Sequence, residues 1–173
     1  MIDVLPLEPL HHNLLGPPND LLEALSERYP DEIHQFYQAH NLEMTGKLIL
    51  SFLCVIEVFE LNCKFDIYLE GRGGKFAGPS TRRIMTDPLL SNLKRLLPDS
   101  IASLVYDYLA ALWALHGVCM AEHLTPDWPD YIARFKELFL QLYHHPDLAH
   151  NEKKVNMTYK VHNLVDHLGD WFR

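Results

Sequence analysis

Cysteine is scarce in this sequence, with three residues, at positions 54, 63 and 119, among 173. Their odd number and wide spacing argue against the disulfide framework of small secreted domains. Cys54 and Cys119 lie among apolar residues, where a free thiol behaves as a small core side chain. This cysteine usage favours a reducing compartment, and we expect an intracellular protein.

Signals for secretion and for a membrane are also lacking. The chain begins Met-Ile-Asp-Val, without the basic and long apolar regions of a signal peptide. The apolar stretch at 48–59 is interrupted by Ser51 and Glu57 and is too short to span a bilayer. We therefore expect no membrane partner.

Alternation of apolar and polar residues, the mark of half-buried strands, is nearly absent, and apolar stripes with helical spacing take its place. The clearest stripes are Ile49, Phe52, Leu53, Ile56 and Phe59; Ile101, Leu104, Val105, Tyr108, Leu112, Leu115 and Cys119; Tyr131, Phe135, Leu138, Phe139 and Leu142; and Val161, Leu164, Val165, Leu168 and Phe172. Short connections separate about eight helical segments. The sequence predicts an all-α fold, with one compact multi-helix domain over 1–173.

Two segments depart from the helical pattern. Residues 1–18 hold five proline and glycine residues, and proline disfavours helix in the residue before it, so we expect an extended lead-in there. Residues 71–78 contain four glycines together with Arg72 and Lys75, which predicts a basic loop.

Charge is unevenly distributed along the chain. The formal net charge is −8, yet the 71–95 segment holds six basic residues and one acidic residue, Asp87. A local basic surface on an acidic body fits a contact with the phosphates of DNA or RNA. The candidate residues are Lys75, Arg82, Arg83, Lys94 and Arg95. The alternative is a loop without a ligand, followed by a solvated helix face.

Histidine is abundant, with eleven residues, but no spacing matches a zinc site. A polar cluster of interest comprises His11, His162, Asp166 and His167. His162 and Asp166 are four residues apart and share a helix face, and an aspartate-oriented histidine is a general-base arrangement. No activated nucleophile accompanies the pair, so a structural contact is the simpler interpretation. We predict no catalytic residue, no metal and no cofactor.

Three blocks of the chain carry a resemblance to a known family. They are Pro9-Leu10-His11-His12-Asn13-Leu14-Leu15-Gly16, the 74–85 segment with Gly-Lys-Phe-Ala-Gly-Pro, and the 157–168 segment with Lys160, His162 and His167. In this order they resemble transposon-encoded, transposase-like proteins of arthropods and cnidarians. The first block departs from the family pattern through the extra His12 and the following Pro17-Pro18.

The resemblance implies a helical region that accompanies a nuclease core with an acidic metal-binding triad. No β-rich core precedes the helical pattern here, and the chain ends before the acidic segment that follows in the family. We therefore expect a non-catalytic domain of a transposase-like protein, nuclear if the resemblance holds, which contacts nucleic acid or a protein partner.

Two alternatives remain open. The first is a protein-interaction or oligomerisation module, unrelated to DNA, with an exposed aromatic patch of Trp128, Trp171 and Phe172. The second is a metal-dependent enzyme that uses the histidine and aspartate residues.

Overall fold

The computed structural model describes residues 16–40, 42, 78–121, 125–148 and 159–166. These residues fold as α-helices without strands, which confirms the all-α class. The described helices are α1 (Pro17–Arg28), α2 (Pro30–Ala39), α5 (Gly78–Ile84), α6 (Asp87–Leu96), α7 (Asp99–Met120), α8 (Trp128–Tyr143) and α9 (Tyr159–Asp166). They number seven, and the helix predicted from the stripe between Ile49 and Phe59 lies outside the described residues.

Proline sets where several of these helices begin. α1 starts at Pro17 and Pro18, where a missing backbone N–H costs nothing, and the Asp20 N–H already bonds to the Gly16 carbonyl at 3.1 Å. The extended lead-in predicted to residue 18 is therefore wrong for its last two residues, and residues 1–15 lie outside the described part. Pro30 ends α1 and starts α2 in the same way.

The basic segment forms two short helices. Gly78, which we assigned to the glycine loop, is the first residue of α5, and the rest of that loop is not among the described residues. α6 begins after the extended Thr86 with a proline in its first turn. It ends at the extended Leu97, because the residue before Pro98 is disfavoured in helical conformation.

The longest helix, α7, follows the predicted stripe closely. Ile101, Val105, Tyr108, Leu112 and Leu115 are all buried. α7 is also the only described helix long and apolar enough to cross a membrane, a property that the core helices of soluble proteins share. Asp99 and Ser100 lie in its first turn, where either residue type is a frequent cap, but no side chain caps this helix.

The buried face of α8 differs from its predicted stripe at one position. Tyr131 is 36% exposed, and Ile132, 9% exposed, joins Phe135, Phe139 and Leu142 on the buried face. The spacing of three, four and three residues keeps this set on one side of a 3.6-residue helix, and Tyr131, four residues before Phe135, lies on the same side without being covered.

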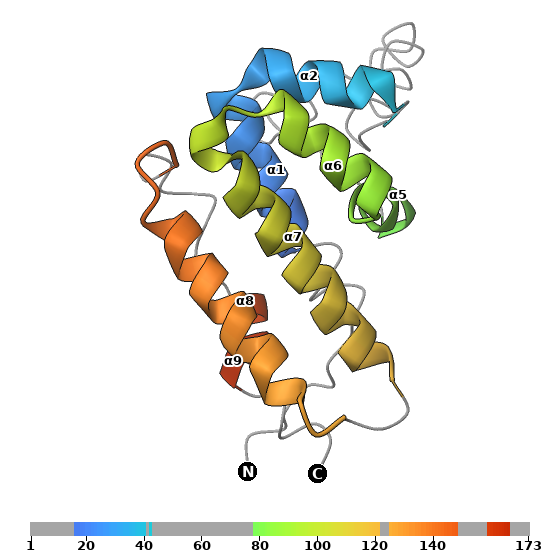
Figure 1. The fold of residues 1–173 in the computed structure, drawn as a ribbon, viewed down its shortest axis with the longest axis vertical. Helices are drawn as coiled ribbons and strands as arrows, with labels where there is room; N and C mark the ends of the chain where they lie inside the picture. The colour runs from blue at the N-terminus through green and yellow to red at the C-terminus, as the bar shows by residue number, and fades with distance from the viewer. Residues whose placement is uncertain (1–15, 41, 43–77, 122–124, 149–158, 167–173) are drawn as a thin grey trace, which may run out of the picture.

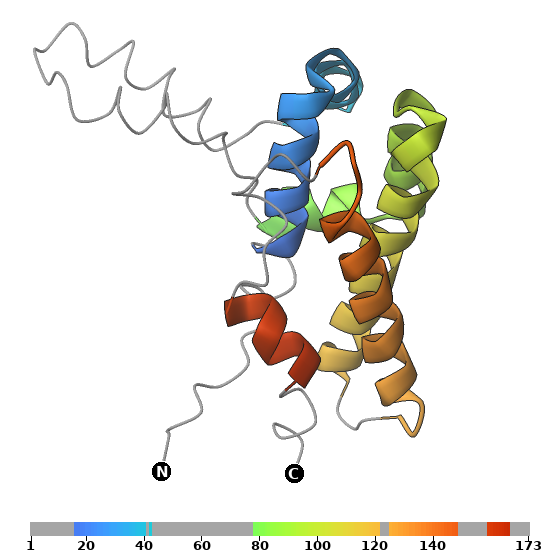
Figure 2. The ribbon, with the colours of Figure 1, turned by 90° about the vertical axis from the view of Figure 1, so that its left-hand side faces the viewer.

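The helices surround α7 on several sides. α7 and α8 run antiparallel and make the most extensive helix–helix contact, and α6 packs on another side of α7 (Figure 1). α2 lies across one end of the assembly, where it contacts α1 and α6. α9 packs against α8, away from α2 (Figure 2).

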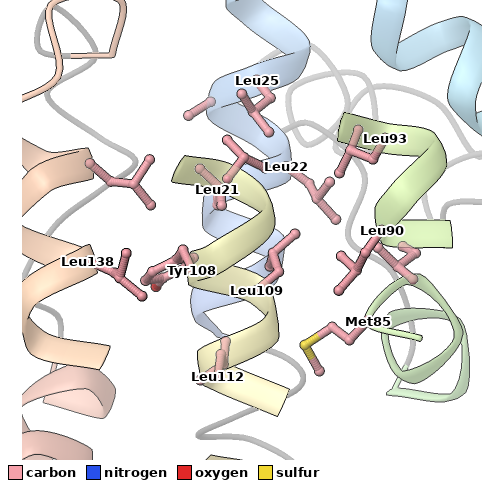
Figure 3. Close-up of a cluster of buried hydrophobic side chains, with 14 of the residues drawn as sticks. Leu21, Leu22, Leu25, Met85, Leu90, Leu93, Tyr108, Leu109, Leu112 and Leu138 are labelled. Carbon is pink, nitrogen blue, oxygen red and sulfur yellow. The ribbon is translucent and has the colours of Figure 1, made fainter. Parts of the chain in front are cut away.

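The buried apolar side chains of all seven helices, or of the residues next to them, join in one cluster. Leu21, Leu22 and Leu25 of α1 lie with Tyr108, Leu109 and Leu112 of α7 in the centre of this cluster, with Leu90 and Leu93 of α6 on one side and Leu138 of α8 on the other (Figure 3). The core therefore fixes α5 and α6 against α7, and with them the candidate basic residues.

Candidate functional site

Four of the five candidate phosphate contacts lie in the described residues and are exposed. Arg82 and Arg83 occupy the last turn of α5, and Lys94 and Arg95 the last turn of α6. We call these four residues the basic strip. Cations in the last turn also stabilise the negative end of a helix dipole, so each has a local structural role as well. Lys75 lies outside the described residues.

Arg83 also holds two helices together. Its guanidinium donates a 3.3 Å hydrogen bond to the carbonyl of His40, the residue that ends α2. The His40 ring in turn lies 3.0 Å from the Asn92 amide oxygen on α6. Arg83 thus satisfies a carbonyl that the helix itself leaves unpaired, and its removal is expected to loosen α2.

Lys94 lies on the opposite side of α6, against α7. Its ammonium is 5.1 Å from the centroid of the Tyr106 ring, which is cation–π distance. The Tyr106 hydroxyl donates to Asp87 at 2.8 Å, and this hydrogen bond raises the pKa of Tyr106. The negative Asp87 therefore lowers the positive potential on this side of the basic strip.

Arg82 and Arg95 are the least engaged members. Neither forms an ion pair or hydrogen bond within the part of the chain that the structure describes. Arg82 lies close enough to His116 of α7 to lower the pKa of that histidine, although burial is the larger cause. Arg95 follows Asn92 by three residues, so it lies on the side of α6 that faces α2. Arg83 of α5 also contacts the end of α2. Arg82 lies in the last turn of α5 and Arg95 in the last turn of α6, so most of α6 lies between these two arginines along the chain.

The predicted polar cluster is only partly assembled among the described residues. The His162 ring nitrogen Nδ1 lies 2.8 Å from the Asp166 carboxylate, as the four-residue spacing predicts. Lys136 of α8 approaches the same carboxylate at 3.9 Å, so the pair links α9 to α8. His11 and His167 lie outside the described residues. Within the described ranges no three metal-binding side chains converge.

A polar junction around Asp147 was not predicted from the sequence. The Asp147 carboxylate accepts hydrogen bonds from the Tyr29 hydroxyl at 2.8 Å and from the Ser100 hydroxyl at 3.3 Å. Arg28 forms a 3.6 Å ion pair with it, and the His145 ring reaches the Ser100 carbonyl at 3.1 Å. The hydrogen bond from Tyr29 is the main reason that the pKa of Asp147 is lowered.

The Asp147 junction joins the end of α1, the start of α7 and the loop after α8. It explains why Ser100 caps no helix, because its hydroxyl donates to Asp147 instead. The His-His-Pro-Asp run at 144–147 was the only sequence signal for it, and its partners Tyr29 and Ser100 are too distant in sequence to be found from spacing.

His116 is a second unpredicted feature. It is 5% exposed, and its Nδ1 has no hydrogen-bond partner among the described residues. The ring stacks on Trp113 at 5.3 Å. It follows the buried Leu112 by four residues, a spacing that would have placed it in the core stripe.

The expected aromatic patch is not supported at Trp128, the member that the structure describes. Trp128 is half-buried and packs against the core, while Trp171 and Phe172 lie outside the described residues. An apolar groove of about 290 Å³ lies instead where α7 ends and α8 begins. It is lined by Ala114, Gly117, Val118, Ala121, Thr125 and Tyr131.

Comparison with protein-family models, with curated proteins and with solved structures gives no match to this chain.

Proposed function

We propose that this chain is a non-catalytic, α-helical binding domain that contacts the phosphates of DNA or RNA through the basic strip, Arg82, Arg83, Lys94 and Arg95. The observation that carries the proposal is the placement of four exposed cations on two successive helices, α5 packed on α6 and α6 packed on the core helix α7. The resemblance to transposase-like proteins, and a nuclear location, are parts of the same proposal.

The geometry favours contact with the backbone over the reading of bases. The four cations form two pairs, one in the last turn of α5 and one in the last turn of α6, so they do not share one recognition helix. Arginine and lysine spread in this way neutralise phosphates and carry no sequence information. We therefore expect binding with little sequence preference and strong dependence on salt.

The Arg82→Gln, Arg95→Gln double variant tests this proposal best. These two residues make no described ion pair or hydrogen bond, so the fold should survive, whereas Arg83 holds the end of α2. Two lost phosphate contacts should weaken binding of a short DNA duplex or an RNA hairpin at least about tenfold at low salt. Lys136→Gln on α8 is the matched control, since Lys136 is also an exposed cation and lies outside the basic strip. Unchanged affinity of the double variant would remove the nucleic-acid function.

A metal-dependent enzyme is less well supported than a binding domain. The His162–Asp166 pair is bound to Lys136 of the neighbouring helix, which is a structural contact between α8 and α9. The non-catalytic assignment stays part of the proposal, and measurement of nuclease activity with added magnesium or manganese would test it. Divalent-metal-dependent cleavage of DNA by the purified chain would contradict it.

A further inference from the structure

We propose that the groove between α7 and α8 binds an amphipathic helix of a partner protein that carries lysine or arginine beside its apolar face. This surface is separate from the basic strip, so the inference does not depend on nucleic-acid binding.

The groove has an apolar floor built from small residues. Ala114, Gly117 and Val118 of α7, with Ala121 directly after it, form one wall, and Tyr131 of α8 forms the other. Small side chains let another backbone approach closely, and aromatic rings provide a large contact area. A groove of this shape suits the apolar face of a helix, which binds through anchors three and four residues apart.

No contact within the described fold requires glycine at position 117. It lies near the end of α7, exposed to solvent, and a Cβ atom added there would meet nothing within 4 Å. Glycine weakens a helix interior relative to alanine, and alanine would fit here without any clash. A closely packed partner would account for Gly117, because the partner would occupy the space that a larger side chain would fill.

Exposed apolar side chains continue the groove beyond its floor. Met120 is 61% exposed and follows Gly117 by three residues, so it lies on a neighbouring part of the same helix surface. Tyr131 is 36% exposed on the facing helix. Flexible methionine next to an apolar groove is a common feature of surfaces that bind amphipathic helices.

Acidic residues beside the groove favour a partner helix that carries positive charge. Asp127 and Asp130 are exposed at the start of α8, beside Tyr131, and neither forms an ion pair among the described residues. Arg134, one turn further along α8, is already paired with Asp107 at 3.6 Å and with Glu137 at 3.0 Å. The rim is therefore acidic, and it complements a basic helix and disfavours an acidic one.

The test uses two synthetic 15-residue amphipathic helices as probes, one of leucine and lysine and one of leucine and glutamate. We expect the leucine–lysine helix to bind the full chain at least tenfold more tightly in fluorescence anisotropy at physiological salt. Gly117→Arg should weaken that binding at least tenfold, because the arginine fills the groove and repels the lysine residues. Ala133→Arg adds the same charge at an exposed α8 position outside the groove, and it should change binding less than threefold.

Three results would overturn the proposal. The first is equal binding of the two probes, and the second is equal weakening by Gly117→Arg and Ala133→Arg. The third is a dimer in sedimentation that Gly117→Arg converts to a monomer, since the occupant would then be a second copy of the chain. Circular dichroism of both variants should match that of the wild type, as neither new side chain enters the core.

Discussion

The Tyr29 hydroxyl at the end of α1 donates a 2.8 Å hydrogen bond to Asp147, 118 residues away beyond the end of α8. The same carboxylate accepts from Ser100 at the start of α7, so three helices meet at one acceptor. A half-buried carboxylate with several donors is worth more than an exposed ion pair, because it is less well screened by water. The junction therefore fixes the end of the bundle opposite to the groove.

The first prediction concerns the strength of this junction. Tyr29→Phe and Asp147→Asn should each lower the free energy of unfolding by about 1–2 kcal/mol, toward the low end for a hydrogen bond to a charged group because the Asp147 side chain is partly exposed. The double variant should lose less than the sum, because both changes remove the same bond. Urea unfolding of the four proteins would measure the coupling, and strict additivity would show that the bond contributes nothing.

Acidic pH should remove the stabilisation that the Asp147 junction provides. The pKa of Asp147 is lowered from 3.8, chiefly by the hydrogen bond from Tyr29. The ionised carboxylate therefore stabilises the fold above the unfolded-state pKa, and this contribution is lost as the pH falls through the lower folded-state value. The stability difference between wild type and Asp147→Asn should be constant from pH 7 to pH 5 and shrink in more acidic solution. A difference that grows as the pH falls would contradict this assignment.

His116 should destabilise the fold in mildly acidic solution. Burial, and secondarily Arg82, lower the pKa of His116 from 6.5, so the folded chain takes up this proton less readily than the unfolded chain. Stability should therefore fall as the pH drops below 6.5, and His116→Phe should remove that part of the fall while it keeps a ring against Trp113. Thermal unfolding at pH 7.5 and pH 5.5 would measure it. His34→Gln, which removes an exposed histidine from α2, is the matched control.

Two leucines should differ strongly in the stability lost when each is replaced by alanine. Leu109 of α7 is fully buried between α1 and α6, and Leu140 of α8 is 42% exposed. Leu109→Ala should cost about 2–5 kcal/mol of stability through lost burial and the cavity that remains. Leu140→Ala should change stability by less than about 0.5 kcal/mol. Similar losses at both positions in chemical denaturation would show that α7 does not occupy the centre of the fold.

The sequence predicts the helices well where one periodic stripe dominates. The predicted α7 stripe agrees with the structure, because the periodic signal is local to one helix. The α8 stripe fails at Tyr131 because a helix turns 100° per residue and the adjacent Ile132 completes the buried face equally well. Ser100 illustrates a different limit, since its hydroxyl serves a tertiary partner and not its own helix.

The candidate site was predictable only in part. The exposure of the basic strip and the His162–Asp166 pair follow from helical spacing. The division of the strip, with Arg83 bound to the end of α2 and Lys94 against Tyr106 of α7, does not, because it depends on where α2 and α7 pack. The groove at Gly117 and the junction at Asp147 likewise arise from elements distant in sequence, which no spacing rule connects.

The salt dependence of nucleic-acid binding tests the central claim most directly. The affinity of the chain for a 20-base-pair DNA duplex should be measured by fluorescence anisotropy from 50 to 200 mM salt. Four phosphate contacts predict a slope of log affinity against log salt of about −3 to −4, and Arg95→Gln should reduce its magnitude by about one. No binding at 50 mM salt, or a slope that Arg95→Gln leaves unchanged, would contradict the assignment of the basic strip as a phosphate-binding surface.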